Sequence, residues 1–207
     1  MPQTFVRSVV LTLALAAVPL SAGAQVGVPA PRQMPSMRPR IGIGYVANIP
    51  NQMVGVTGHF VSPTLLGGLG LYVDAKLDNS SPEDEEGFIP DLTAEQVAET
   101  RNDVIFQQAG SWQTVNVALM KPVTSQLVAY AGAGVSKVTE YNEYFDEARE
   151  MGRLGFYWVE DEERSGTHAN FMGGVFFQLG ESFAVQMGGE TRPAGFTMGL
   201  TYLLPLR

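Results

Sequence analysis

The side chains that could do chemistry in this chain are few and scattered. The chain has two histidines, His59 and His168, and neither has neighbours at the His, Cys, Asp or Glu spacing of a zinc site. It contains no cysteine and no Gly-x-Ser-x-Gly nucleophile motif. The sequence therefore predicts no catalytic residue, no metal ligand and no cofactor, and it favours a structural role for both histidines.

A second group of polar side chains lies inside apolar, alternating segments. If these segments are strands, the polar residues share one face, because side chains alternate across a strand. We expect them to fill the interior of a narrow barrel as a hydrogen-bonded network. A path for protons or ions is the alternative, but eight strands leave an interior only just wide enough for side chains. The predicted lumen network comprises His59, Asp74, Lys76, Asn170, Gln178, Gln186 and Glu190.

The strand pattern is clearest over residues 168–204. Phe171, Val175 and Phe177 share one face, and after short connections the alternation restarts at Phe183 and at Phe196. The opposite face of all three segments carries Gly, Ala, Thr, Asn and Gln with a single Glu, where a soluble sheet would place long charged side chains. Such strands are typical of a barrel with lipid outside and a packed polar interior.

Five further segments show strand character, which makes eight in total. The facing of the fifth strand, 127–138, stays open because it is rich in Ala and Gly. Thr93 and Gln96 have capping-box spacing, which predicts a short helix, and residues 104–106 could begin the fourth strand early. The five segments are 41–48, 53–61, 69–76, 111–120 and 127–138.

The lengths of the connections support the same fold independently. The two long ones, 77–110 and 140–165, follow the third and fifth strands, so an up-and-down barrel places both at one end. Outer-membrane barrels have long external loops and short periplasmic turns. The sequence therefore predicts an all-β fold: an eight-stranded antiparallel up-and-down transmembrane β-barrel with short periplasmic turns and two long acidic external loops. The flanks of 140–165 could also prolong the adjacent strands as a hairpin.

The negative charge of the chain belongs to these two segments. Each holds nine acidic residues, together 18 of the 21 in the chain. Nucleic-acid binding is disfavoured because phosphates would be repelled. Repulsion within the loops predicts that divalent cations or a basic partner surface offset it; the alternative is that the loops only keep the surface hydrated. The aromatic residues expected to contact a partner at the surface are Tyr141, Tyr144, Phe145, Tyr157 and Trp158.

The N-terminus predicts export. Residues 1–24 have the features of a cleaved signal peptide, with Arg7, an apolar run over Val9–Leu20 and Ala22-Gly23-Ala24 before the cleavage position. The apolar run is too short for a membrane-spanning helix, which needs about 20 residues. Residues 25–40 are a Pro-rich lead-in without periodicity. The barrel domain is expected to occupy 41–207.

Aromatic residues are expected to form girdles at the two membrane interfaces. Those near the short turns are Phe60, Phe177, Phe183 and Tyr202, and those near the long loops are Trp112, Phe171 and Phe196.

In pattern, residues 41–204 resemble the small eight-stranded outer-membrane barrels of the OmpA/OmpX type. The most specific part is Thr197–Leu204, which fits the terminal assembly signal of that class through Gly199, Tyr202 and Leu204. The resemblance implies an integral protein of the cell outer membrane, surrounded by its lipids and recognised by the barrel-assembly machinery. The chain departs from members that end at an aromatic residue, because it adds Pro205-Leu206-Arg207.

Three function classes remain to be separated. The favoured one is a structural or interaction scaffold that displays its loops and has no open pore. A secreted or periplasmic lipocalin-like ligand-binding barrel would have apolar residues lining a cavity and charges outside, and the near-absence of charge on either strand face argues against it. A small outer-membrane lipid-modifying enzyme is the weakest candidate, because no catalytic motif is present.

Overall fold

A computed structural model describes residues 39–62, 68–78, 81–85, 87–101, 103–152 and 154–205. The expected signal peptide and most of the expected lead-in lie outside the described residues, as do Leu206 and Arg207. No helix in the described part of the chain is long and apolar enough to span a membrane.

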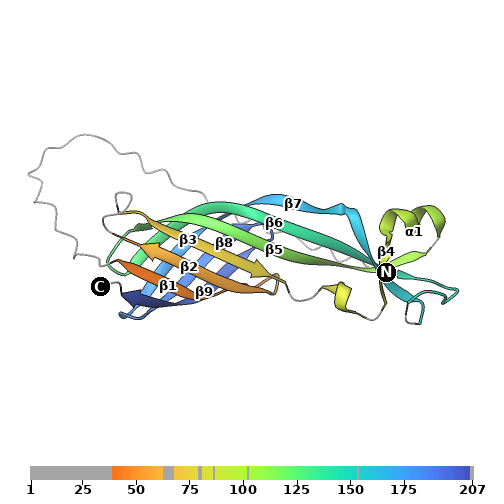
Figure 1. The fold of residues 1–207 in the computed structure, drawn as a ribbon, viewed down its shortest axis with the longest axis horizontal. Helices are drawn as coiled ribbons and strands as arrows, with labels where there is room; N and C mark the ends of the chain where they lie inside the picture. Colours follow the sequence, from red (N-terminus) through yellow and green to blue (C-terminus); the bar gives the residue numbers. More distant parts are fainter. Residues whose placement is uncertain are drawn as a thin grey trace, which may run out of the picture. The chain divides into compact units, whose positions relative to one another are not determined.

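Eight antiparallel strands close into a barrel (Figure 1). Each strand pairs with its neighbours in the chain, and β1 pairs with β9 to close the ring, with Arg40 opposite Pro205. The predicted fold is confirmed, and the β1–β2 hairpin has the expected register from Asn48–Met53 to Arg40–Val61. The strands are β1 (Arg40–Asn48), β2 (Met53–Val61), β3 (Gly70–Leu77), β5 (Val104–Pro122), β6 (Leu127–Phe145), β7 (Phe156–Leu179), β8 (Phe183–Thr191) and β9 (Ala194–Pro205).

The alternation of side chains separates the inside of the barrel from the outside. In β3, Tyr72, Asp74 and Lys76 are buried, whereas Leu71 and Val73 are exposed. An exposed apolar surface of this extent is far larger than soluble monomers show, so the barrel surface faces lipid. Exposed apolar residues on the barrel strands include Ile43, Tyr45, Val54, Val56, Leu71, Val73, Val115, Val117, Leu119, Val135, Phe171, Phe177, Phe183, Met187, Phe196, Met198, Leu200, Tyr202 and Leu204.

The prediction that Trp112 belongs to the outer aromatic girdle is wrong. Trp112 has the same parity in β5 as the buried residues Thr114 and Asn116, so its side chain belongs to the lumen face at the end of the barrel. Phe171 and Phe196, the other two residues of that predicted girdle, are exposed on the outer surface.

Three strands continue beyond the barrel. β3 ends with Leu77 opposite Gln113, but β5 begins at Val104 and stays paired with β6 as far as Phe145. β7 likewise pairs with β6 from Phe156 onward, whereas its pairing with β8 begins only at Met172. The strands that were expected to begin at 111, to end at 138 and to begin at 168 are therefore longer than predicted. The early start at 104–106 and the hairpin formed by the flanks of 140–165 are confirmed.

A fourth strand and a helix join this extension. β4 (Phe88–Thr93) pairs in parallel with β7, with Phe88 opposite Trp158. α1 (Ala94–Thr100) follows directly, and its capping box is as predicted: Gln96 N donates to Thr93 Oγ1 at 3.3 Å, and Thr93 N donates to Gln96 Oε1 at 3.0 Å. We call β4, α1 and residues 104–112, 138–145 and 156–166 the platform.

Candidate functional site

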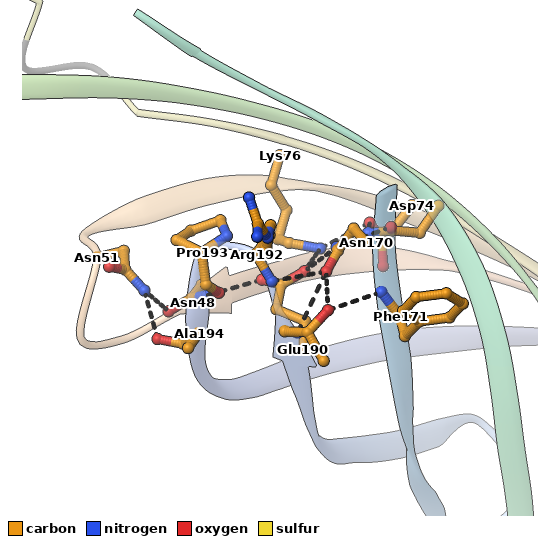
Figure 2. Close-up of polar contacts among 12 residues, drawn as sticks. Asn48, Asn51, Asp74, Lys76, Asn170, Phe171, Glu190, Arg192, Pro193 and Ala194 are labelled. Atoms are coloured by element: carbon orange, nitrogen blue, oxygen red, sulfur yellow. Dashed lines mark hydrogen bonds and ion pairs between the residues drawn. The ribbon is translucent and has the colours of Figure 1, made fainter. Parts of the chain in front are cut away.

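The centre of the lumen holds two carboxylates and one ammonium group (Figure 2). Lys76 Nζ lies 2.7 Å from Asp74 Oδ1 and 3.2 Å from Glu190 Oε2, and all three side chains are inaccessible to solvent. Asp74 and Lys76 come from β3 and Glu190 from β8, so the Lys76–Glu190 pair connects opposite parts of the ring. Buried charges persist only when they are paired and hydrogen-bonded.

Three asparagine side chains join the carboxylates. Asn116 Nδ2 donates to Asp74 Oδ1 at 2.9 Å, and Asn48 Nδ2 donates to Glu190 Oε1 at 2.7 Å. Asn170 Nδ2 lies 3.0 Å from Glu190 Oε2 and 2.9 Å from Asn116 Oδ1. Asn170 Oδ1 also accepts the backbone N–H of Arg192 at 2.8 Å, which fixes the turn between β8 and β9 (Figure 2). These donors offset the excess of one negative charge.

An aromatic layer lies next to this charged centre. Tyr72 donates its hydroxyl to Asp74 Oδ2 at 2.6 Å, and Gln186 Nε2 bonds both Tyr72 and Tyr130 at 2.8 and 3.0 Å. The rings of Tyr72 and Tyr130 stack with centroids 5.1 Å apart, and both contact Phe176. Side chains from four different strands therefore fill the barrel cross-section.

The structure brings most of the predicted lumen residues together, but not all. Asp74, Lys76, Asn170, Gln186 and Glu190 belong to one connected network. Two residues of the prediction lie apart from it, His59 and Gln178. The His59 ring packs on Phe176 at 4.7 Å with no hydrogen-bond partner for Nδ1, and Gln178 Nε2 donates to the Gly180 carbonyl at 2.7 Å.

Sequence reasoning missed Asn48, Tyr72, Asn116 and Tyr130 as members of the network. Asn116 follows the buried parity of β5, which the alternation with Val115 and Val117 already indicated. Asn48 is the last residue of β1, where the pattern gives way to a turn. Tyr130 lies in the Ala- and Gly-rich strand whose facing the sequence left open.

The aromatic residues expected at the platform surface are mostly buried, so that prediction is wrong. Tyr141 is 1% exposed, and Tyr144, Tyr157 and Trp158 are buried as well. Phe145 is half-buried against Phe156, with ring centroids 4.8 Å apart. The cause is the helix and strand that the acidic segment supplies: Tyr144, Tyr157 and Val159 form a small core with Val97 of α1.

Hydrogen bonds to carboxylates hold two of these tyrosines in place. Tyr141 donates to Glu83 Oε1 at 2.5 Å, and burial together with this bond raises the pKa of Tyr141 to about 12. Tyr157 donates to Asp103 Oδ2 at 2.6 Å, and burial and the Asp103 carboxylate raise its pKa as well. Both phenols remain protonated donors at neutral pH, so their bonds to the acidic segment 77–110 persist there.

Arg101 joins the end of α1 to the tip of the β6–β7 hairpin. Its Nε lies 3.0 Å from Asp103 Oδ2, and its Nη2 lies 3.5 Å from Asp146 Oδ2. Asp146 also accepts the backbone N–H groups of Ala148 and Glu150, both at 2.9 Å. Burial alone would raise the pKa of Asp146, but these N–H groups and Arg101 lower it overall.

An acidic cleft lies on the platform between α1 and strands β6 and β7. Its volume is about 510 Å³. Within the described ranges, no group of three or more His, Cys, Asp or Glu side chains is arranged to hold a metal ion. The residues that line the cleft are Thr93, Ala94, Glu95, Ala98, Ile105, Asn142, Tyr144, Asp161, Glu162 and Glu163.

At one edge of the platform, the first part of β5 is paired, among the described residues, only on the side that faces β6. Beyond Leu77 and Asp78, no described residue pairs with β5 on the side where β3 lies in the barrel. Val104, Ile105 and Phe106 of this stretch are 66%, 47% and 64% exposed. Exposed apolar edge strands are sites at which another strand can pair.

Comparison with known proteins gives matches only among solved structures. No family model matches the chain, and neither does any curated protein. The attachment invasion locus protein Ail of Yersinia pestis is 11% identical, with a TM-score of 0.47, covering 81% of this chain and 98% of its own. A de novo designed transmembrane β-barrel is 13% identical with a TM-score of 0.39, covering 83% of this chain and 98% of its own. Neisserial surface protein A is 9% identical with a TM-score of 0.31, covering 80% and 92%.

The pairings within this chain establish the closed eight-stranded barrel on their own. A closed antiparallel barrel with an even number of strands, an apolar outer surface and a polar interior is the architecture of outer-membrane proteins. The predicted resemblance to the small eight-stranded outer-membrane barrels is thus confirmed at the level of the fold.

Proposed function

We propose that the protein is an integral outer-membrane barrel whose platform recruits a protein partner outside the cell. The observation that carries this proposal is the open edge of β5, where Val104, Ile105 and Phe106 are exposed and no described strand pairs with β5 on the side away from β6. A partner segment in extended conformation would add a strand here, with main-chain hydrogen bonds supplying affinity. The barrel then serves as the membrane anchor of the platform.

The direction of the β5 backbone identifies the groups available for pairing. Trp112 accepts a hydrogen bond from Asp78 N at 2.8 Å, so the main-chain groups of Trp112 point toward β3. Backbone groups alternate sides along a strand, so those of Gln108 and Gly110 point to the open edge and those of Ala109 point to β6. The register shift between Ile105 and Gln107 changes this alternation nearer the start of the strand.

The charge of the platform selects a basic partner. Segments 77–110 and 140–165 hold 18 acidic residues and only four basic ones, and the cleft beside the β5 edge carries Glu95, Asp161, Glu162 and Glu163. A second copy of this chain would bring like charges together, which disfavours pairing between copies. An extended segment rich in lysine or arginine could pair with the β5 edge and would be attracted by the negative charge around it.

The rest of the chain supports an anchor rather than a channel. The lumen network and the aromatic layer of Tyr72, Tyr130 and Phe176 fill the interior. We also infer that the barrel-assembly machinery reads the last strand. Its signal residues Tyr202 and Leu204 are exposed on the outer surface of β9, and Gly199 lies where a Cβ would meet the Tyr45 carbonyl oxygen at 2.7 Å.

Peptide binding to the protein in nanodiscs tests the proposal. The probe is a synthetic peptide of alternating lysine and valine, compared with the same peptide carrying glutamate for lysine. Gln108→Pro removes a main-chain donor that points to the open edge, and we expect about tenfold weaker binding, as for one lost hydrogen bond with its local strand pairing. Gln108→Ala is the matched control, because it loses the side-chain bond to Asn142 Oδ1 at 2.8 Å but keeps the donor.

The two variants separate edge pairing from simple charge attraction. Equal binding by wild type and Gln108→Pro would contradict pairing at this edge. Equal binding of the lysine and glutamate peptides would contradict a basic partner.

A further inference from the structure

A blind cavity lies inside the barrel at the end opposite the platform. Its volume is about 110 Å³, and its mouth is formed by Arg40 at the start of β1 and by Ser125 and Gln126 in the turn between β5 and β6. The inner end meets the aromatic layer, because Phe176 lines the cavity and packs against Tyr72 and Tyr130. The cavity walls are mostly apolar: Val61, Met120, Val128, Phe176, Ala184 and Leu203.

His59 is an unpartnered polar group in the wall of this cavity. Its side chain belongs to a residue only 7% exposed, and its Nδ1 has no hydrogen-bond partner. The ring lies over Gly42, where a Cβ would collide with the imidazole, and against Phe176 at 4.7 Å. The imidazole lines the cavity, so a ligand inside would pack against the ring.

Arg40 supplies a positive charge at the mouth. It is half-buried, and among the described residues it forms no ion pair. Gln178, which also lines the cavity, donates to the Gly180 carbonyl. An unpaired guanidinium beside an apolar cavity favours an anionic group at the mouth, because arginine matches the geometry of a carboxylate.

We propose that this cavity binds a small carboxylate with an aromatic or branched apolar body. The apolar body would fill the space beside Phe176 and Ala184 and pack against the His59 ring, and the carboxylate would meet Arg40. At about 110 Å³ the cavity is smaller than an apolar cavity of about 150 Å³ that takes up benzene, so its ligand is limited to a single ring or a branched chain with the carboxylate at the mouth. The site is separate from the platform and does not depend on the function proposed for it.

Fluorine NMR with the protein in nanodiscs tests the proposal directly. The probes are 4-fluorobenzoate, the neutral analogue 4-fluorobenzyl alcohol, and trifluoroacetate, which carries the charge without the ring. We expect saturable binding of 4-fluorobenzoate. Arg40→Gln should weaken it about tenfold, as for one lost charge-assisted hydrogen bond, toward the affinity of the alcohol. Ala184→Leu should abolish binding by filling the cavity, whereas Val185→Leu on the lipid-facing side should leave it unchanged.

A second readout needs only the wild-type chain. Benzoate should slow the modification of His59 by diethyl pyrocarbonate but leave His168 unaffected, as measured by peptide mass spectrometry. Absence of saturable benzoate binding would overturn the proposal, and so would unchanged binding in Ala184→Leu or unprotected His59. Equal affinity for benzoate and the alcohol would overturn the carboxylate class.

Discussion

Lys76 Nζ lies 2.7 Å from Asp74 Oδ1, although the two residues are only two positions apart on one strand. Side chains at such positions share a face of the strand, so β3 alone carries both charges of this pair into the lumen. Glu190 completes the group from the other side of the barrel, with its Oε2 at 3.2 Å from the same ammonium. The lysine is therefore the only cation that neutralises two buried carboxylates in the described lumen.

Removing that cation should destabilise the barrel strongly. Lys76→Met leaves Asp74 and Glu190 buried without a positive partner, and we expect a loss of about 3–5 kcal/mol in unfolding free energy. Urea unfolding of the barrel refolded in lipid vesicles measures it, and the retention of compact migration in unheated SDS samples reports folding. Lys137→Met, an exposed lysine on β6, is the matched control. The double variant Lys76→Met/Asp74→Asn should recover part of the loss; equal stability of Lys76→Met and wild type would contradict the role of the pair.

The filled lumen predicts that the protein forms no stable pore. Planar-bilayer recordings of the wild type should show no steady, porin-sized conductance, because charged groups and aromatic rings occupy the narrow interior. Replacing both Tyr72 and Tyr130 by alanine removes the stacked rings and should raise ion leakage, whereas Leu71→Ala on the outer face should not. A steady large conductance of the wild-type protein would refute the filled interior.

The platform should be most stable at mildly acidic pH. Burial and the neighbouring Glu85 raise the pKa of Glu143, so the folded platform binds this proton more tightly than the unfolded chain does. Stability therefore increases as the pH falls through the raised pKa of Glu143 toward its ordinary value of 4.5. Asp146 has the opposite sign: its lowered pKa contributes stability that is lost as the pH falls below its ordinary value of 3.8.

Amide hydrogen exchange along the β6–β7 hairpin, corrected for the intrinsic rate at each pH, measures this optimum. Glu143→Gln should protect the hairpin at neutral pH and remove the gain on acidification, whereas Asp146→Asn should weaken the tip at neutral pH. Protection that only falls as the pH is lowered from neutral would contradict the role of Glu143.

The barrel was predictable because side chains alternate between its polar interior and its apolar exterior along each strand. The pattern from Phe171 to Phe177 and from Phe196 to Tyr202 gives both the strands and their facing, and the structure agrees. The lengths of the connections between strands also predicted the up-and-down topology. The facing of a strand could not be predicted where the residues are small, as around Tyr130, because Ala and Gly do not distinguish lipid from a packed lumen.

The platform was less predictable because its contacts join segments far apart in the chain. Val97 of α1 is buried by Tyr144 and Tyr157, which follow it by 47 and 60 residues, and periodicity carries no information about such a contact. The same cause explains why aromatic residues in a charged segment were interpreted as surface anchors. Thr93 and Gln96 were the exception, since a helix cap is a local signal.

The uneven lengths of the strands have a mechanical consequence. β6 and β7 remain paired from Phe145–Phe156 to Leu127–Phe177, with a single register shift between Val138 and Glu140. β5, which carries the open edge, is likewise paired with β6 from Val104–Phe145 to Pro122–Val128. Because the ladder bonds lie perpendicular to the strands, a pull along β5 loads many of these bonds at the same time, in shear. Tension on the proposed partner of this edge would thus pass into the barrel wall without peeling the sheet open.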